Sequence, residues 1–293
     1  DNKVKSFVFA SSSSVYGDAD IFVCDPTTSG TADVCDTGDW TQSFEDSAAF
    51  TGVMMMAVFN NKLYAGMIGS TTGADIYVCT EGADNVCGTG EWSKIYDGSV
   101  DGVIDMVVYQ GKLYAGLGTS AGEGDIIVCN PAGSGSDATI CDDASEWTTA
   151  YDSSDYYWAH GLDVYNGRLY ASMYGTMGQG EVLMCTQGAD NTCASSEWSV
   201  SFLSADYEAA YDLQVAQGKL FVALGAGGGD GDVYVCDPTL SGSATDCGSS
   251  DWNVYVDGAQ EQFYALGELN GKLYAGQGVN AGLGVCADIS GDD

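Results

Sequence analysis

Apolar and polar residues alternate along this chain in short runs, and the same runs return about every 50 residues. The clearest run reads Lys-Leu-Tyr-Ala-Gly or a variant of it, and it begins at Ser6, Lys62, Lys112, Arg168, Lys219 and Lys272. Repetition at this period indicates a small supersecondary unit that buries its apolar face by stacking on copies of itself. No helical period accompanies the repeat, so the units are expected to consist of strands.

Each repeat predicts four strands, which we call a, b, c and d. Strand a is an apolar run such as 53–60 or 211–217, and strand b is the Lys-Leu-Tyr-Ala-Gly run after it. The Asn-Gly pairs at 166–167 and 270–271 predict two-residue hairpin turns between these strands. Strand c begins with an acid and ends in a cysteine, and strand d begins at a tryptophan. Repeated four-stranded antiparallel units of about 50 residues predict an all-β fold, a β-propeller.

The same order of elements resembles β-propellers of the kelch and Asp-box type. Segment Asp36–Trp40, which reads Asp-Thr-Gly-Asp-Trp, is similar to an Asp-box turn. The resemblance covers nearly the whole chain and implies the architecture. It implies no activity, because propellers host many unrelated functions.

Ten of the eleven cysteines bracket the loop between strands c and d, which predicts one local disulfide in each complete repeat. The predicted pairs are Cys24 with Cys35, Cys79 with Cys87, Cys129 with Cys141, Cys185 with Cys193, and Cys236 with Cys247. A closed loop of this size stabilises a fold by roughly 2.5–3 kcal/mol in the chain-entropy model. So many cysteines without a Cys-x-x-Cys zinc pattern indicate an oxidising, extracellular location.

The spacing of these pairs bears on the number of blades. It runs 11, 8, 12, 8 and 11 residues, which indicates duplication of a two-blade unit and hence six blades, with five as the alternative. A single propeller domain over 1–293 would then be divided into blades whose first and last members are incomplete. The blades span about 1–48, 49–99, 100–153, 154–204, 205–259 and 260–293.

The incomplete ends leave Cys286 unpaired or bonded to another molecule. Three explanations remain open: the chain is a fragment, the ring has five blades with 271–287 as a projecting hairpin, or a neighbouring subunit completes the ends. The third would propagate head to tail into a filament, because an open sheet edge seeks a partner strand.

Charge narrows the classes of partner. The chain carries 42 acidic and 8 basic residues, for a net charge of −34. Nucleic acid is excluded because phosphate binding requires clusters of Lys or Arg, and anionic membranes are disfavoured for the same reason. No apolar run reaches 18 residues, so no membrane-spanning helix is predicted.

Catalytic candidates are few. The one histidine, His160, has Asp163 nearby in sequence, but a Ser–His–Asp triad built on it would be unspecific. A sialidase is excluded because those enzymes bind their substrate with a cluster of arginines, and Arg168 is the one arginine in the chain. Arg168 itself is expected to be a strand-edge charge. No pair of carboxylates stands out for glycoside cleavage. The sequence therefore predicts no catalytic residue.

Two binding sites are predicted. Calcium would bind acid-rich turns at Asp18 and Asp20 and at Asp230 and Asp232, because hard cations prefer several oxygen ligands. The alternative is that the acids opening strand c only accept turn N–H groups. Tyr156, Tyr157 and Trp158 form the densest aromatic cluster and are candidates for glycan stacking. The remaining tryptophans are expected to pack between blades.

The function predicted from the sequence is a secreted, non-catalytic structural or surface-assembly subunit that associates with copies of itself. A carbohydrate-binding propeller is the alternative, and a glycan-active enzyme is the third hypothesis. No cofactor besides calcium is expected.

Overall fold

The computed structural model describes most of the chain in two compact units. It describes residues 19–25, 35–45, 50–69, 73–82, 86–131, 137–152, 154–175, 179–226, 231–243, 245–258, 262–278 and the backbone of 285–288. Unit 1 comprises 1–103 with 130–146, and unit 2 comprises 104–129 with 147–293. Among these residues, no helix has the length and apolar character needed to cross a membrane.

Unit 1 contains a two-stranded and a four-stranded antiparallel sheet. The first pairs β1 (Ile21–Cys24) with β2 (Trp40–Phe44), and the second has the order β3-β4-β5-β6, with β3 at Gly52–Phe59, β4 at Lys62–Ile68, β5 at Asp75–Cys79 and β6 at Trp92–Asp97. Its core includes Ile21, Phe50 and Met67, which are almost fully buried. A short 3₁₀ helix, η1 (Ala144–Glu146), also belongs to this unit.

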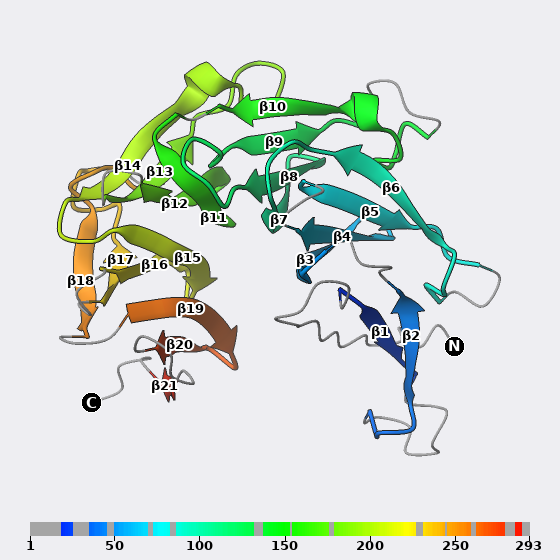
Figure 1. The fold of residues 1–293 in the computed structure, drawn as a ribbon. Coiled ribbons are helices and arrows are strands. Elements are labelled where there is room, and N and C mark those ends of the chain that lie inside the picture. Colours follow the sequence, from blue (N-terminus) through cyan, green and yellow to red (C-terminus); the bar gives the residue numbers. More distant parts are fainter. Residues whose placement is uncertain are drawn as a thin grey trace. The chain divides into compact units, whose positions relative to one another are not determined.

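Unit 2 repeats the same antiparallel hairpin pairs (Figure 1). The strands are β7 (Val103–Tyr109, from Ile104 on in this unit), β8 (Lys112–Leu117), β9 (Ile126–Cys129), β10 (Trp147–Tyr151), β11 (Tyr156–Tyr165), β12 (Arg168–Gly175), β13 (Gly180–Cys185), β14 (Trp198–Ser204), β15 (Ala209–Ala216), β16 (Lys219–Gly225), β17 (Asp232–Cys236), β18 (Trp252–Asp257), β19 (Gln262–Leu269), β20 (Lys272–Gly278) and β21 (Val285–Asp288), with the 3₁₀ helix η2 at Ser195–Glu197. One pair, Tyr174 with Ala209, links β11–β14 to β15–β18.

The turns between the first two strands of the repeats have the conformation that the sequence predicts. Asn166 and Gly167 have φ of 48° and 75°, and Asn270 and Gly271 have φ of 55° and 77°. Two successive residues with positive φ define the turn whose twist matches that of the flanking strands. These hairpins fix the register of the first two strands of each repeat.

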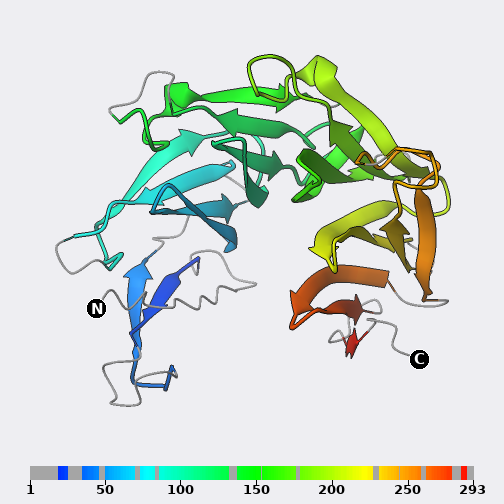
Figure 2. The ribbon, with the colours of Figure 1, turned by 180° about the vertical axis from the view of Figure 1, so that it is seen from behind.

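The first strands of the unit 2 repeats lie on one margin of their sheets, which we call the inner margin. Figures 1 and 2 both show β15 beside β19, and β11 contacts both β8 and β15. The last strands, β10, β14 and β18, lie on the opposite, outer margin (Figure 1). Between the margins the core is built from buried aromatic and aliphatic residues such as Phe221, Val222 and Leu224.

Local disulfides and tyrosine hydroxyls stabilise the loops that precede the last strands of the repeats, including those at the outer margin of unit 2. Four bridges join Cys24 to Cys35, Cys79 to Cys87, Cys185 to Cys193, and Cys236 to Cys247, and Cys129 and Cys141 are disulfide-bonded as well. The tyrosine of one repeat accepts the N–H of the second cysteine of the next, so that the hydroxyl oxygen of Tyr170 lies 3.0 Å from the nitrogen of Cys247. Tyr114 and Cys193 form the same contact at 3.1 Å.

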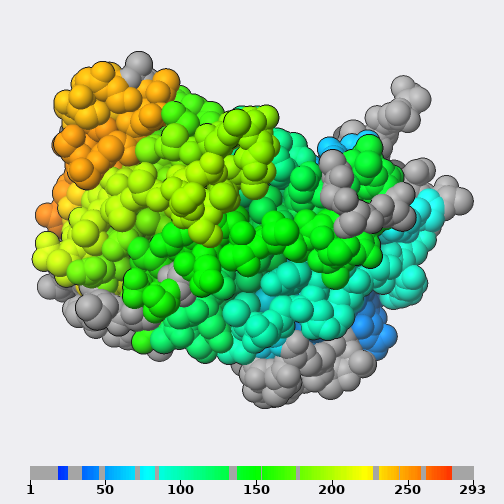
Figure 3. Space-filling view, turned by 90° about the horizontal axis from the view of Figure 1, so that it is seen from above, coloured from blue at the N-terminus to red at the C-terminus, as the bar shows by residue number. Residues whose placement is uncertain are grey.

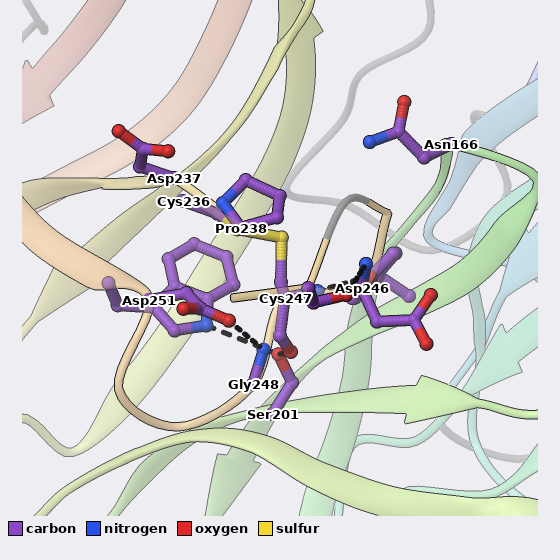
Figure 4. Close-up of a disulfide and its surroundings, with 12 residues drawn as sticks. Asn166, Ser201, Cys236, Asp237, Pro238, Asp246, Cys247, Gly248 and Asp251 are labelled. Atoms are coloured by element: carbon purple, nitrogen blue, oxygen red, sulfur yellow. Dashed lines mark hydrogen bonds between the residues drawn. A yellow bond between two sulfur atoms is a disulfide. The ribbon is translucent and has the colours of Figure 1, made fainter. Parts of the chain in front are cut away.

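Figure 4 shows the Cys236–Cys247 bridge with Asp251 and Ser201 beside it. Asp251 accepts the N–H of Gly248 at 2.7 Å, and Ser201, from the neighbouring repeat, donates to the carbonyl of Cys247 at 2.5 Å. In the space-filling view, the yellow-green atoms near residue 200 lie directly against the orange atoms near residue 250 (Figure 3). The disulfide loops therefore stabilise the contact between neighbouring sheets.

The predicted all-β architecture of antiparallel four-stranded repeats with local disulfides is confirmed. The division into one domain with the predicted blade boundaries stays a prediction. The strand predicted at Ser6, the calcium ligands Asp18 and Asp230, and the side chain of Cys286 lie outside the described residues.

Candidate functional site

An aromatic surface lies along the inner margin of unit 2. It consists of Tyr157, Trp158, His160, Tyr174, Tyr211 and Tyr264, from strands β11, β12, β15 and β19. The ring of His160 lies 4.8 Å from that of Trp158 and 5.3 Å from that of Tyr211. Tyr211 in turn lies 4.7 Å from Tyr264. The rings thus form a continuous track across three repeats.

β-Bulges orient four of these six rings. The pairing of β11 with its neighbour skips two residues, Tyr157 and His160. The pairings of β15 and β19 skip one residue each, Tyr211 and Tyr264. A bulge leaves the extra residue outside the ladder and re-aims its side chain. His160, Tyr211 and Tyr264 each stand six residues before the first residue of the hairpin turn. Four of the six rings of the aromatic surface therefore come from β-bulges that recur in the first strands of three repeats.

The rings remain accessible. Tyr264 is 41% exposed, and the other five residues are partly exposed. The indole N–H of Trp158 is buried and has no hydrogen-bond partner among the described residues. Tyr156, by contrast, is 7% exposed and bonds to Glu181, so it is withdrawn from this surface. Of the three residues predicted for glycan stacking, Tyr157 and Trp158 belong to the aromatic surface.

Three carboxylates accompany the aromatic surface on the same strands. We call Asp105 on β7, Asp163 on β11 and Asp212 on β15 the inner carboxylates. Each accepts the N–H of the residue that follows it and, through its second oxygen, the N–H of a residue on the next inner strand. The second partners are Leu162 for Asp105, Val215 for Asp163 and Leu266 for Asp212, each at 2.7 Å. They therefore join neighbouring repeats, and each is partly exposed.

Burial changes the acidity of these groups. It is the largest cause that raises the pKa of Asp105 to about 7 and that of Asp212 to about 6, and it also raises the pKa of Asp163. The charges of Asp212 and Asp163 add to the effect at Asp105, which indicates that the three groups lie near one another. The two backbone N–H bonds to each carboxylate act in the opposite direction. The site thus holds carboxyl groups that titrate near neutral pH.

His160 is a weak base in this structure. Burial lowers the pKa of His160 to about 4, so the ring is neutral under ordinary conditions. Asp163 does not bond to His160, because its two oxygens accept the backbone N–H groups of Val164 and Val215. His160 is therefore a neutral member of the aromatic surface, and the triad considered from the sequence is not formed by Asp163.

The acids that open strand c are engaged inside the protein. Asp232 accepts the N–H of Gly258 at 3.1 Å and the hydroxyl of Tyr207, and Glu181 accepts the hydroxyl of Tyr156. Asp75 pairs with Lys94 at 3.3 Å. No cluster of three or more potential metal ligands occurs in the part of the chain that is described. Calcium binding involving Asp20 and Asp232 stays a prediction.

Arg168 lies away from the inner margin, at the start of β12. Its guanidinium pairs with Asp246 in a disulfide loop at 3.1 Å. It is a charge at a strand end, as expected. The tryptophan side chains that open the last strands also pack between repeats, since Trp252 donates to the hydroxyl of Ser201 at 3.1 Å.

Comparisons with known proteins show that this chain is similar in fold to solved carbohydrate-active enzymes. A Trichoderma reesei protein of the carbohydrate-active enzyme family AA12 is similar over 92% of this chain and 90% of its own, with a TM-score of 0.53 and 10% identity. A calcium structure of the same family has a TM-score of 0.51, 10% identity, and coverage of 93% and 89%. A GH43 β-xylosidase/α-arabinofuranosidase from a compost microbial metagenome covers 78% of this chain and 85% of its own at a TM-score of 0.41 and 11% identity. No protein-family model and no curated protein sequence matches the chain.

These neighbours overturn two predictions. The non-catalytic, filament-forming subunit and the prediction that the protein is not an enzyme are both contradicted, because the neighbours that share the fold over most of this chain belong to a carbohydrate-active enzyme family. The filament hypothesis relied on strand counts near the chain ends, which carry no information about the inner strands. No local sequence motif joins the inner carboxylates, because Asp105, Asp163 and Asp212 come from three different repeats.

Proposed function

We propose that this protein is a glycan-active enzyme whose substrate lies on the aromatic surface and whose acid–base groups are the inner carboxylates. One observation carries the proposal: the aromatic surface and the inner carboxylates share strands. Tyr211 and Asp212 are adjacent in sequence on β15, and Trp158, His160 and Asp163 all lie on β11. The fold neighbours from a carbohydrate-active family support the class of substrate.

The two groups have complementary chemistry. Aromatic rings offer flat apolar faces to the C–H faces of sugar rings, and their burial on binding is favourable. Carboxyl groups that titrate near the working pH are the most effective proton donors and acceptors. Asp105, with a pKa of about 7, and Asp212, with a pKa of about 6, can hold and release a proton at neutral pH. Most glycoside hydrolases use a pair of carboxyl groups, one as the general acid and the other as the base or nucleophile.

Proton uptake at an inner carboxylate has a structural consequence. Both oxygens of Asp212 already accept backbone N–H groups, from Leu213 at 2.8 Å and Leu266 at 2.7 Å. A proton on either oxygen competes with one of these bonds. Acid–base chemistry at this residue is thus coupled to the contact between β15 and β19.

The test is an activity screen with matched variants. The purified chain is incubated with neutral, amine-bearing and acidic polysaccharides, and released reducing ends are measured. Asp212→Asn should lower the rate by about 10²-fold or more, since that is the usual contribution of an acid–base group. The control, Asp206→Asn, changes an exposed acid six residues away and should leave the rate unchanged. Full activity in Asp105→Asn, Asp163→Asn and Asp212→Asn alike would refute the assignment of these groups.

We also propose six blades, a secreted location and calcium binding for this chain. Six is supported by the strands of six successive repeats, in which the described part supplies at least two strands each. Secretion is supported by the disulfide-bonded cysteines, because such bridges persist in oxidising compartments. Calcium would be held at Asp18, Asp20, Asp230 and Asp232, and a calcium titration followed by thermal unfolding tests it.

A further inference from the structure

The aromatic surface has a one-sided electrostatic environment. Every basic residue of unit 2, namely Lys112, Arg168, Lys219 and Lys272, directly follows a hairpin turn. His160, Tyr211 and Tyr264 stand six residues before those turns, which is about 20 Å along an extended strand. Positive side chains are therefore gathered at the other end of the inner strands.

Negative charge lies close to the rings instead. Glu208 directly precedes Ala209, the residue of β15 that pairs with Tyr174, so it lies at the end of β15 that carries Tyr211. Its charge raises the pKa of both Tyr174 and Tyr211, after burial as the main cause. Asp212 follows Tyr211 in sequence. His160 contributes no positive charge, because burial holds its pKa at about 4. An acidic group beside several aromatic faces attracts cations, since the ring face carries negative charge as well.

We infer that the aromatic surface selects glycans that carry protonated amines, that is, unacetylated amino sugars. This inference rests on the proposed function and specifies its substrate class. The sugar rings stack on Tyr211 and its neighbours, while the ammonium group lies against the ring faces and Glu208. Anionic glycans are disfavoured by Glu208, Asp212 and the net charge of −34.

The experiment compares oligosaccharides of equal length by calorimetry near pH 6. The probes are β-1,4-linked oligomers of glucosamine, of N-acetylglucosamine and of glucose, and an oligomer of glucuronic acid. The glucosamine oligomer should bind about tenfold more tightly than its acetylated counterpart, a preference typical of one favourable cation–aromatic contact. Added salt should reduce this preference, and the glucuronic acid oligomer should not bind.

Three variants locate the effect. Glu208→Gln should remove most of the preference for glucosamine and leave binding of the acetylated oligomer unchanged. Asp206→Asn removes the same charge two residues away and should retain the preference, and both residues are exposed, so folding should not be affected. Tyr211→Leu should weaken both oligomers, because it removes a stacking face.

The outcomes separate the two proposals. Equal binding of the glucosamine and acetylated oligomers overturns the inference and leaves the proposed function standing. The inference also fails if Glu208→Gln and Asp206→Asn lower the preference equally, since the effect would then be general charge attraction. If no oligosaccharide binds and none is cleaved, the proposed function fails, and the inference fails with it.

Discussion

The inner and outer margins of unit 2 join neighbouring repeats in different ways. At the outer margin, Tyr114 and Tyr170 accept the N–H groups of Cys193 and Cys247, and burial raises the pKa of both phenols to about 12. At the inner margin the acceptors are carboxylates, of which Asp105 has a pKa of about 7. The outer contacts are thus unaffected by any ordinary pH, whereas the inner ones change charge near neutrality.

The outer contacts stabilise the fold, whereas the inner contacts contain the carboxyl groups that we propose for acid–base chemistry. The outer tyrosines are fully buried, and the disulfides beside them restrict the unfolded chain. The inner carboxylates are partly exposed and lie on the strands that carry the aromatic surface. Burying carboxylates at a cost in stability is typical of functional sites. Changes at the two margins should therefore affect different properties.

Removal of one disulfide should have the largest effect on stability. The double variant Cys236→Ala/Cys247→Ala opens a loop of about 12 residues, which should cost about 3 kcal/mol. For a chain of this size that lowers the melting temperature by roughly 6–12 °C. Calorimetry measures the loss, and binding of oligosaccharides at low temperature should persist. If the double variant were folded but no longer bound oligosaccharides, the outer margin would also affect binding, which would contradict the separate roles of the two margins.

Asp105→Asn should have the next largest effect. The amide NH₂ cannot accept the N–H of Leu162, which leaves a buried donor without a partner and should cost about 1–3 kcal/mol. Unfolding by denaturant measures this loss. Asp206→Asn, at an exposed site, is the control and should change stability by less than about 0.5 kcal/mol.

Tyr170→Phe tests how much an outer contact between repeats contributes to stability. The change removes the acceptor for the N–H of Cys247 and keeps the ring, so the expected loss is about 1 kcal/mol or somewhat more. Because the phenol does not titrate below its pKa of about 12, the loss should be the same at pH 6 and pH 8. A loss that differs between the two pH values would show that the outer contact is coupled to titrating groups.

The smallest predicted effect is a pH dependence of stability. The folded pKa of Asp105, about 7, lies above its ordinary value of 3.8, so the folded state binds the proton more tightly than the unfolded state. Stability is then lost as pH rises toward and through 7, and melting should occur about 3 °C higher at pH 6.5 than at pH 8. Below pH 6.5 the lowered pKa of His160 acts in the opposite direction. Asp105→Asn should flatten the profile between pH 6.5 and 8.

Local pattern predicted much of the fold. The hairpin turns, the strand order and the disulfides each depend on residues close in sequence, which is why Asn166-Gly167 and the pairing of Cys185 with Cys193 could be predicted. A further local signal was missed. The acid before each tryptophan caps the preceding turn, as Asp251 does for Gly248. The other members are Asp39, Glu91, Glu146 and Glu197.

The candidate site could be predicted only in part. Tyr157 and Trp158 stood out because they belong to the densest aromatic cluster, whereas Tyr211 is a single aromatic in an apolar run and Tyr264 follows only Phe263. Their exposure depends on β-bulges, and no glycine, proline or other turn residue in the sequence marks the position of these bulges. The recurring position six residues before the turn is the one sequence signal that relates them. Asp105 and Asp212 share a second position, five residues before the turn, but their proximity arises only when repeats pack together.

The position of a bound sugar tests the central claim most directly. In a crystal structure of the chain with a bound oligosaccharide, a sugar ring should stack on Tyr211 or Tyr264, with an inner carboxylate in reach of a glycosidic oxygen. A sugar bound instead at the disulfide loops of the outer margin, with the inner margin empty, would contradict the account.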